Sequence, residues 1–108
     1  MILLTEVEHY IAIIKPVRED FMKNWTEADE KIMGEHFEYL KSLLKEGKLV
    51  IAGPALNEQK PFGLVILHCD SLEEANKIMT NDPSVKSGIQ NLKLVEPFRL
   101  SLYSPPKK

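Results

Sequence analysis

The chain has 108 residues, enough for one domain of ordinary size, and we expect a single domain over residues 1–108 with frayed ends at 1–6 and 104–108. Hydrophobic residues make up 44% and charged residues 28%, a mix typical of a folded globular protein. The formal net charge is −2 and lysine and arginine form no cluster, which argues against nucleic-acid binding; charges of both signs are interspersed, which argues against a membrane-surface helix.

Cysteine and histidine usage gives no sign of a disulfide or a metal. Cys69 is the single cysteine, so no disulfide can form within the chain. The three histidines, His9, His36 and His68, lack metal-site spacing, and we expect neither metal nor cofactor. No apolar run approaches the ~18–20 residues of a membrane span, and the opening MILLTEVE is too short for a signal peptide. A cytoplasmic location is the default expectation.

The first half of the chain predicts a strand followed by a long helix. Residues 8–16 are rich in β-branched and aromatic side chains and predict a strand that ends at Pro16. After a connecting segment, Thr26 opens a helix, because Thr26 and Asp29 have nearly the spacing of a capping box. Acidic residues fill the first turn, where the helix dipole favours them. The helix should end near Gly47, a typical left-handed cap.

Two strands follow the long helix. Residues 48–55 predict a second strand, which we expect Gly53 and Pro54 to stop. A polar connection leads to residues 62–70, which predict a third strand. Gly53 has a second interpretation, in which its small size lets the backbone approach a ligand.

The last part of the chain predicts two short helices and a final strand. Ser71 begins a capping box and should open a helix over residues 72–80. Asp82 then caps a short helical turn, with proline at its first position and Gly88 as its end. Residues 89–103 predict a last strand, bent by a proline.

The predicted order is β-α-β-β-α-β, which favours an α+β, ferredoxin-like fold: an antiparallel sheet with both helices on one face. The strand segments YIAII, LVIA and LVIL are apolar on both faces, whereas a sheet with one wet face should alternate. Two helices cover only one face, so we predict a homodimer in which the two bare sheet faces pack together. A monomer with a partly exposed sheet is the alternative.

His36 is the first candidate for chemistry, because it lies within the apolar stripe of the long helix. A buried imidazole needs a hydrogen-bond partner, and it is either a structural histidine or a functional one. Asp82 is the second candidate, as a helix cap, as a partner of the imidazole, or as both. The stripe is predicted to contain Ile32, Met33, Phe37, Leu40, Leu43 and Leu44.

Over residues 34–98 the sequence resembles the YciI-like, or YCII-related, family of small bacterial proteins. The matching features are H-x-x-Y-L on the helix that contains His36, a strand ending in A-G-P, and a D-S-L-E-E-A helix start. They continue with a D-P-x-V-K-x-G turn that begins at Asp82, and with a closing P-F. The order and spacing of these features together are more specific than any one of them.

The resemblance implies a dimeric α/β barrel with a His–Asp dyad in a cleft, which falls here on His36 and Asp82. Gly53, Pro54 and Ser84 are the predicted lining of that cleft. The family often has an aromatic residue where this chain has Ser84, and alanine where it has Ser87. The loss of the aromatic ring should make the cleft wider and more polar.

A carboxylate beside an imidazole favours its protonated form and fixes its tautomer, which suits general acid/base catalysis near neutral pH. The sequence lacks a nucleophile motif such as G-x-S-x-G, and Cys69 falls within a strand, where packing is its expected role. We therefore predict a small-molecule enzyme that transfers protons, as in an isomerisation or elimination. The alternatives are a dimeric module that binds a metabolite without turnover, and a scaffold with no ligand. The sequence does not name a substrate.

Overall fold

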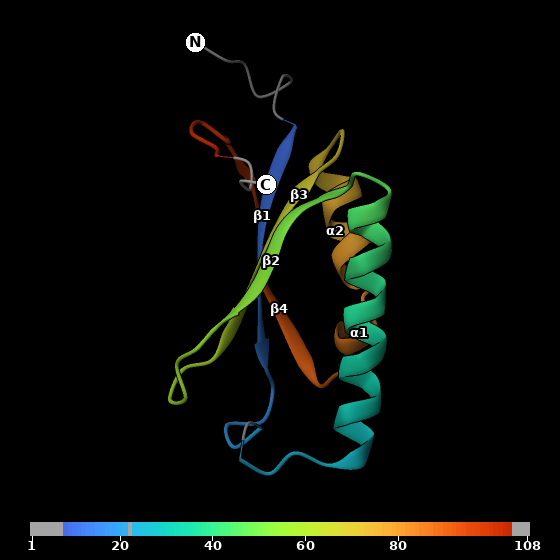
Figure 1. The fold of residues 1–108 in the computed structure, drawn as a ribbon, viewed down its shortest axis with the longest axis vertical. Helices are drawn as coiled ribbons and strands as arrows, with labels where there is room; N and C mark the ends of the chain where they lie inside the picture. The colour runs from blue at the N-terminus through green and yellow to red at the C-terminus, as the bar shows by residue number, and fades with distance from the viewer. Residues whose placement is uncertain (1–7, 22, 105–108) are drawn as a thin grey trace.

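The computed structural model describes residues 8–21 and 23–104 and contains one four-stranded sheet with three helices (Figure 1). The predicted frayed ends therefore lie outside the described residues, apart from Ser104. In chain order the elements are β1 (His9–Pro16), α1 (Glu27–Lys45), β2 (Leu49–Ala55), β3 (Phe62–His68), α2 (Leu72–Thr80), α3 (Pro83–Lys86) and β4 (Gln90–Phe98).

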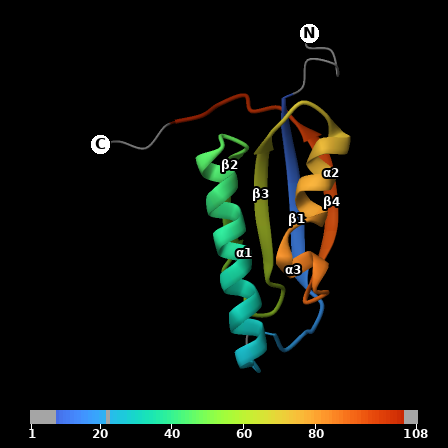
Figure 2. The ribbon, with the colours of Figure 1, turned by 90° about the vertical axis from the view of Figure 1, so that its right-hand side faces the viewer.

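The sheet has the strand order β2-β3-β1-β4, and every neighbouring pair is antiparallel. All the helices lie against the same face, with α1 over the β2 side and α2 and α3 over the β4 side (Figures 1 and 2). This arrangement confirms the predicted α+β, ferredoxin-like fold.

Two predicted strand boundaries are wrong. Gly53 and Pro54 do not stop the second strand, because they pair with Leu64 and Gly63 inside it. β2 is an edge strand, and an edge tolerates a proline whose missing N–H would face no neighbour. At the other end of the chain, β4 ends at Phe98 although the apolar pattern continues toward residue 103.

The helix ends agree closely with their sequence signals. Thr26 accepts a hydrogen bond from the Asp29 N–H at 3.0 Å, and the Asp29 carboxylate accepts one from the Thr26 N–H at 3.0 Å, which completes the predicted capping box. Arg18 also donates to Asp29 at 2.8 Å, so the loop after β1 is fastened to the start of α1. After α1 the chain turns at Gly47, whose φ of 80° strains any residue with a Cβ.

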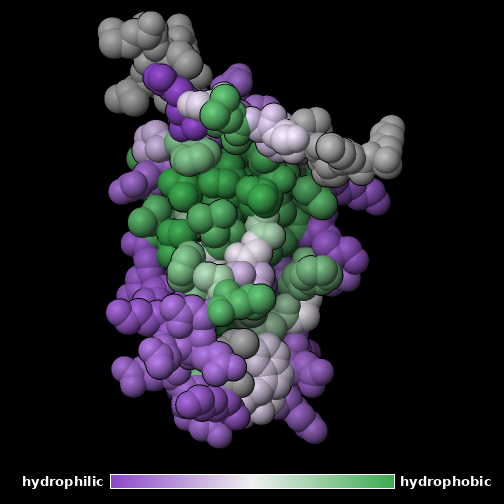
Figure 3. All heavy atoms as spheres, turned by 60° about the vertical axis from the view of Figure 1, so that its left-hand side comes forward, coloured by the Kyte–Doolittle hydropathy of each residue, from purple (hydrophilic) through white to green (hydrophobic). Residues whose placement is uncertain are grey.

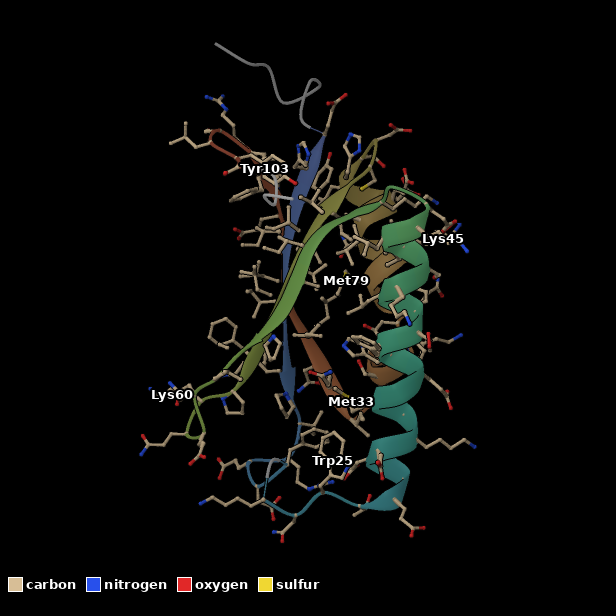
Figure 4. The ribbon with its side chains drawn as sticks, in the orientation of Figure 1. Trp25, Met33, Lys45, Lys60, Met79 and Tyr103 are labelled. Atoms are coloured by element: carbon tan, nitrogen blue, oxygen red, sulfur yellow. The ribbon has the colours of Figure 1, made fainter. Side chains whose placement is uncertain are left out.

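The hydrophobic core lies between the sheet and the helices. Its buried residues come from alternate positions of β1 and β3, from Leu43 of α1, and from Ala75, Ile78 and Met79 of α2. Met33 and Met79 both lie in the layer between helices and sheet (Figure 4). The predicted stripe of α1 is partly wrong, because Phe37 and Leu44 are 61% and 56% exposed on the outer side of the helix.

The opposite sheet face is apolar, and no helix of residues 8–21 and 23–104 covers it. The strand registers place Ile11 beside Ile66, Ile13 between Leu64 and Leu94, and Ile51 beside Ile66. Figure 3 looks toward this side of the molecule and shows hydrophobic residues gathered in one continuous area. We call this surface the open face, defined by Ile11, Ile13, Ile51, Leu64, Ile66 and Leu94. Its composition confirms that the strands are apolar on both faces.

Candidate active site

The middle of α1 and the start of α3 meet at a histidine and an aspartate. His36 lies on the side of α1 that faces the sheet, in the same row as Met33 and Leu43. Asp82 is the N-cap of α3, in extended conformation, and its carboxylate accepts from the Ser84 N–H at 2.8 Å. Pro83 occupies the first helical position, where a missing N–H costs nothing. The cap therefore fixes the carboxylate at a defined place beside α1.

The two side chains are in direct contact. Nδ1 of His36 lies 2.7 Å from Oδ2 and 2.9 Å from Oδ1 of Asp82. The Asp82 side chain is fully buried and the His36 side chain is 12% exposed. A carboxylate acts only as an acceptor when ionised, so the bond requires a hydrogen on Nδ1. Asp82 thus serves as helix cap and imidazole partner at once.

The other ring nitrogen of His36, Nε2, is not engaged by the pair. Among the described residues, the hydrogen bonds of this ring run through Nδ1, and every buried side-chain nitrogen and oxygen has a partner. Nε2 thus has no hydrogen bond within the described residues, and the side chain as a whole is 12% exposed. In the neutral ring, a hydrogen on Nδ1 leaves the lone pair on Nε2, and that nitrogen can accept a proton from a bound molecule.

Two further polar side chains stand behind the pair. The Ser84 hydroxyl lies 2.9 Å from Asp82 Oδ1 and 3.3 Å from His36 Nδ1. Gln90, the first residue of β4, donates to the Ser84 hydroxyl at 3.2 Å. Ser84 was expected from its sequence position, but Gln90 was missed. The sequence did contain a signal for Gln90. Gln90 and Leu92 are two positions apart on a strand and so face the same side, where a glutamine stands among apolar residues.

Among the described residues, no hydrogen bond joins Gly53 or Pro54 to the pair. Both lie on β2, at the sheet edge opposite to β4. Ala52 packs against the core, so by strand alternation Gly53 faces the side of the open face, whereas Pro54 faces the side of the sheet that the helices cover. Hydrogen bonds thus bring together Ser84, His36 and Asp82, and the role of Gly53 and Pro54 as lining residues stays a prediction.

A groove of about 460 Å³ lies between α1 and α2, and its lining contains neither His36 nor Asp82. Tyr39 and Asn81 line it, one turn after His36 and one residue before Asp82 respectively. Burial and the nearby Asp82 charge raise the pKa of the Tyr39 hydroxyl, which donates to the Ile78 carbonyl at 2.6 Å. The groove also has the charged side chains Glu46, Lys48, Glu74 and Lys77 on its wall.

Other chemistry has less support in the structure. Burial raises the pKa of the Cys69 thiol, which donates weakly to the Ser71 carbonyl, so its reactive thiolate form is disfavoured. Across the part of the chain that the structure describes, no three histidine, cysteine or acidic side chains gather closely enough to hold a metal ion. Within those same residues, no helix is both long and apolar enough to cross a membrane.

A family model described as the YCII-related domain matches residues 9–99, nearly the whole described chain. The chain belongs to the YCII-related family. The resemblance seen in the sequence is thereby confirmed, over a longer stretch than the motifs alone covered. No curated protein matches this YCII-related chain in sequence.

Solved structures agree with the fold of this YCII-related protein. One is 5-chloro-2-hydroxyhydroquinone dehydrochlorinase (TftG) from Burkholderia phenoliruptrix AC1100, in complex with 2,5-dihydroxybenzoquinone. It has a TM-score of 0.63 and 21% identity, over 83% of this chain and 93% of that one. The structural-genomics protein YJCS has a TM-score of 0.50 and 18% identity, over 85% and 97%. At these identities the likeness establishes the shared fold.

Proposed function

We propose that the protein is a small-molecule enzyme in which His36 is the general acid/base and Asp82 orients it. The observation that carries the proposal is the contact of Nδ1 with a fully buried carboxylate, combined with an Nε2 that has no hydrogen bond within the described residues on a partly exposed side chain. Nε2 would remove a proton from an acidic C–H or O–H of a bound metabolite. Asp82 would stabilise the imidazolium that forms. In an isomerisation, the imidazolium would return the proton to another atom of the substrate; in an elimination, the substrate would lose a leaving group after the proton is removed.

One fold neighbour, TftG, supports a small, acidic substrate. TftG removes chloride from a chlorinated hydroxyhydroquinone and was solved with a dihydroxybenzoquinone. Phenolic and quinoid rings of this kind have acidic hydroxyl groups, which a histidine can deprotonate near neutral pH. A hydroxylated six-membered ring is therefore the first substrate class to assay.

The test has two parts. The first is release of chloride from 5-chloro-2-hydroxyhydroquinone by the parent protein and by His36→Ala and Asp82→Asn. The second is binding of 2,5-dihydroxybenzoquinone to the same three proteins, measured by calorimetry. Turnover that is lost in His36→Ala supports the enzyme; ligand binding without turnover in any variant favours a metabolite-binding module. If neither turnover nor binding occurs, this substrate class is excluded and the scaffold alternative gains.

We further propose that a second copy of the chain covers the open face. The support is the uninterrupted apolar surface, together with the apolar character of both sides of the inner strands. Exposure of such a surface costs roughly 25 cal/mol per Å², which pairing of two copies would recover. The dimeric barrel of the family provides the expected arrangement, with no nucleic acid or membrane as partner. The cytoplasmic location stays a prediction.

Light scattering after gel filtration tests the dimer, which should have twice the chain mass of 12.4 kDa. Ile51 on the open face and Leu44 on the outer side of α1 form a matched pair, because they are 57% and 56% exposed. Ile51→Lys should dissociate the dimer and Leu44→Lys should not. A parent protein that is monomeric at micromolar concentration would refute the proposal.

A further inference from the structure

Two buried polar residues form a second layer behind the His36–Asp82 pair. Ser84 is fully buried and Gln90 is 5% exposed, although both have side chains that usually face water. A polar group is retained at such a place only if its hydrogen bonds are satisfied, because an unpaired buried donor or acceptor is costly. The bonds that satisfy these two residues lead to Asp82.

The direction of the bonds follows from their partners. The Gln90 amide nitrogen lies 3.2 Å from the Ser84 hydroxyl and 3.5 Å from the sulfur of Met33. A thioether can only accept, so the NH₂ group, and not the carbonyl oxygen, must face Met33 and with it Ser84. Because the Ser84 oxygen accepts from Gln90, its single hydrogen is free to point to Asp82 Oδ1, at 2.9 Å.

The two carboxylate oxygens of Asp82 therefore have different main partners. Oδ1 accepts from both the N–H and the hydroxyl of Ser84, at 2.8 and 2.9 Å. Oδ2 makes the shorter contact to His36, at 2.7 Å. One anchoring N–H alone would let the carboxylate swing about its terminal torsion, which is a soft one. The hydroxyl is a second anchor that restricts this rotation.

We propose that Gln90 and Ser84 are positioning residues, in which Gln90 orients the Ser84 hydroxyl and Ser84 locks the Asp82 carboxylate so that neutral His36 keeps its proton on Nδ1. We call this arrangement of Gln90, Ser84 and Asp82 the lock. Its catalytic meaning rests on the proposed function, since a hydrogen held on Nδ1 leaves Nε2 as the base.

The test uses Ser84→Ala, Gln90→Met and the double variant, with Ser87→Ala as control. Ser87 is the matched control because it ends the same short helix and its hydroxyl, within the described residues, donates to the Ser84 backbone carbonyl and not to the pair. Nitrogen-15 NMR of the His36 ring reports the tautomer, and the exchange of the Nδ1 hydrogen with water reports how firmly Asp82 holds it. Circular dichroism verifies the fold of each variant.

In the parent we expect one tautomer, with the hydrogen on Nδ1. Ser84→Ala should speed exchange of that hydrogen about fivefold, as for the loss of one ordinary hydrogen bond, and should reveal the other tautomer. Gln90→Met should act in the same direction by about twofold. The double variant should equal Ser84→Ala, because Gln90 acts through Ser84 and its effect vanishes without the hydroxyl. Ser87→Ala should match the parent.

The lock is refuted if Ser84→Ala and Gln90→Met both behave as Ser87→Ala does, or if their effects add in the double variant. If Ser84→Ala does not fold, Gln90→Met decides alone, and unchanged exchange refutes the proposal. Asp82→Asn separates this inference from the proposed function. If Asp82→Asn leaves the His36 tautomer unchanged, the pair itself fails; if it changes the tautomer and Ser84→Ala does not, only the lock fails.

Discussion

Removal of the Asp82 carboxylate should be among the most damaging single changes in the protein. Asp82 is fully buried and accepts hydrogen bonds from the Ser84 N–H, the Ser84 hydroxyl and His36 Nδ1. Asp82→Ala removes a helix cap, which costs about 1 kcal/mol. It also leaves two buried donors without an acceptor, each worth ~1–3 kcal/mol. Because His36 is partly exposed and can turn to water, we expect a total of about 3 kcal/mol.

Asp82→Asn keeps the shape of the side chain and one acceptor oxygen for the cap. Its amide group would face Nδ1 of His36 as a donor, so the imidazole must change its tautomer or lose the bond. We expect a cost of about 1 kcal/mol, close to one net hydrogen bond. The order of stability should therefore be parent, Asp82→Asn, Asp82→Ala.

Urea unfolding followed by circular dichroism measures these differences, at one fixed protein concentration because a dimer's stability depends on it. Asp70→Ala is the control, since Asp70 is an exposed aspartate just before a helix cap and should change stability by less than ~0.5 kcal/mol. If Asp82→Ala costs no more than Asp70→Ala, then Asp82 is neither buried nor bonded as described. The assignment of the pair would then be wrong.

Three other predictions concern stability and its pH dependence. Arg18, followed by the Thr26 N–H, holds the pKa of Asp29 at about 2, below its ordinary 3.8, so the stabilisation is present above about pH 4 and is lost as the pH falls through 2. In thermal melts, Asp29→Asn should lie below the parent at neutral pH, and the gap should close toward pH 2. Burial, and then the charge of the stacked His68, lower the pKa of His9 below 6.5, against a smaller opposing effect of Glu8. The folded state thus disfavours protonation of His9, and the free energy of unfolding should fall as the pH drops below 6.5. It should fall less in His9→Gln. An equal dependence of stability on pH in the parent and in His9→Gln would contradict this. Gly47→Ala should cost about 1 kcal/mol because φ is 80° there, whereas Gly34→Ala, with open space around its Cβ in the interior of α1, should gain ~0.5–1 kcal/mol.

Local signals in the sequence predicted the fold well, because each helix has a cap that can be read from neighbouring residues. Thr26, Ser71 and Asp82 all cap as expected. The errors occurred where long-range pairing decides. Pro54 stays in a strand because β2 has an edge position, and a strand's position in the sheet is not a local property.

The candidate site was predictable in part. His36 and Asp82 were found, since an imidazole in an apolar stripe and a carboxylate at a helix start are both visible in the sequence. Their contact was implied by family resemblance and not by spacing, because they are 46 positions apart. Gln90 was missed because its role depends on the residue that accepts a hydrogen bond from its side-chain amide, and the sequence does not show that residue. The assignment of Phe37 to the inner face failed because the apolar stripe is wider than the contact with the sheet.

The residues of the site come from two separate parts of the chain. Asp82, Ser84 and Gln90 all come from residues 82–90, a stretch held together by its own hydrogen bonds and by the turn at Gly88. His36 alone arrives from a distant part of the chain, on a helix that must dock before the ring can meet its partner. The tautomer of His36 therefore reports whether α1 is packed against the sheet. Any condition that separates α1 from the sheet would separate His36 from Asp82 and remove the pair.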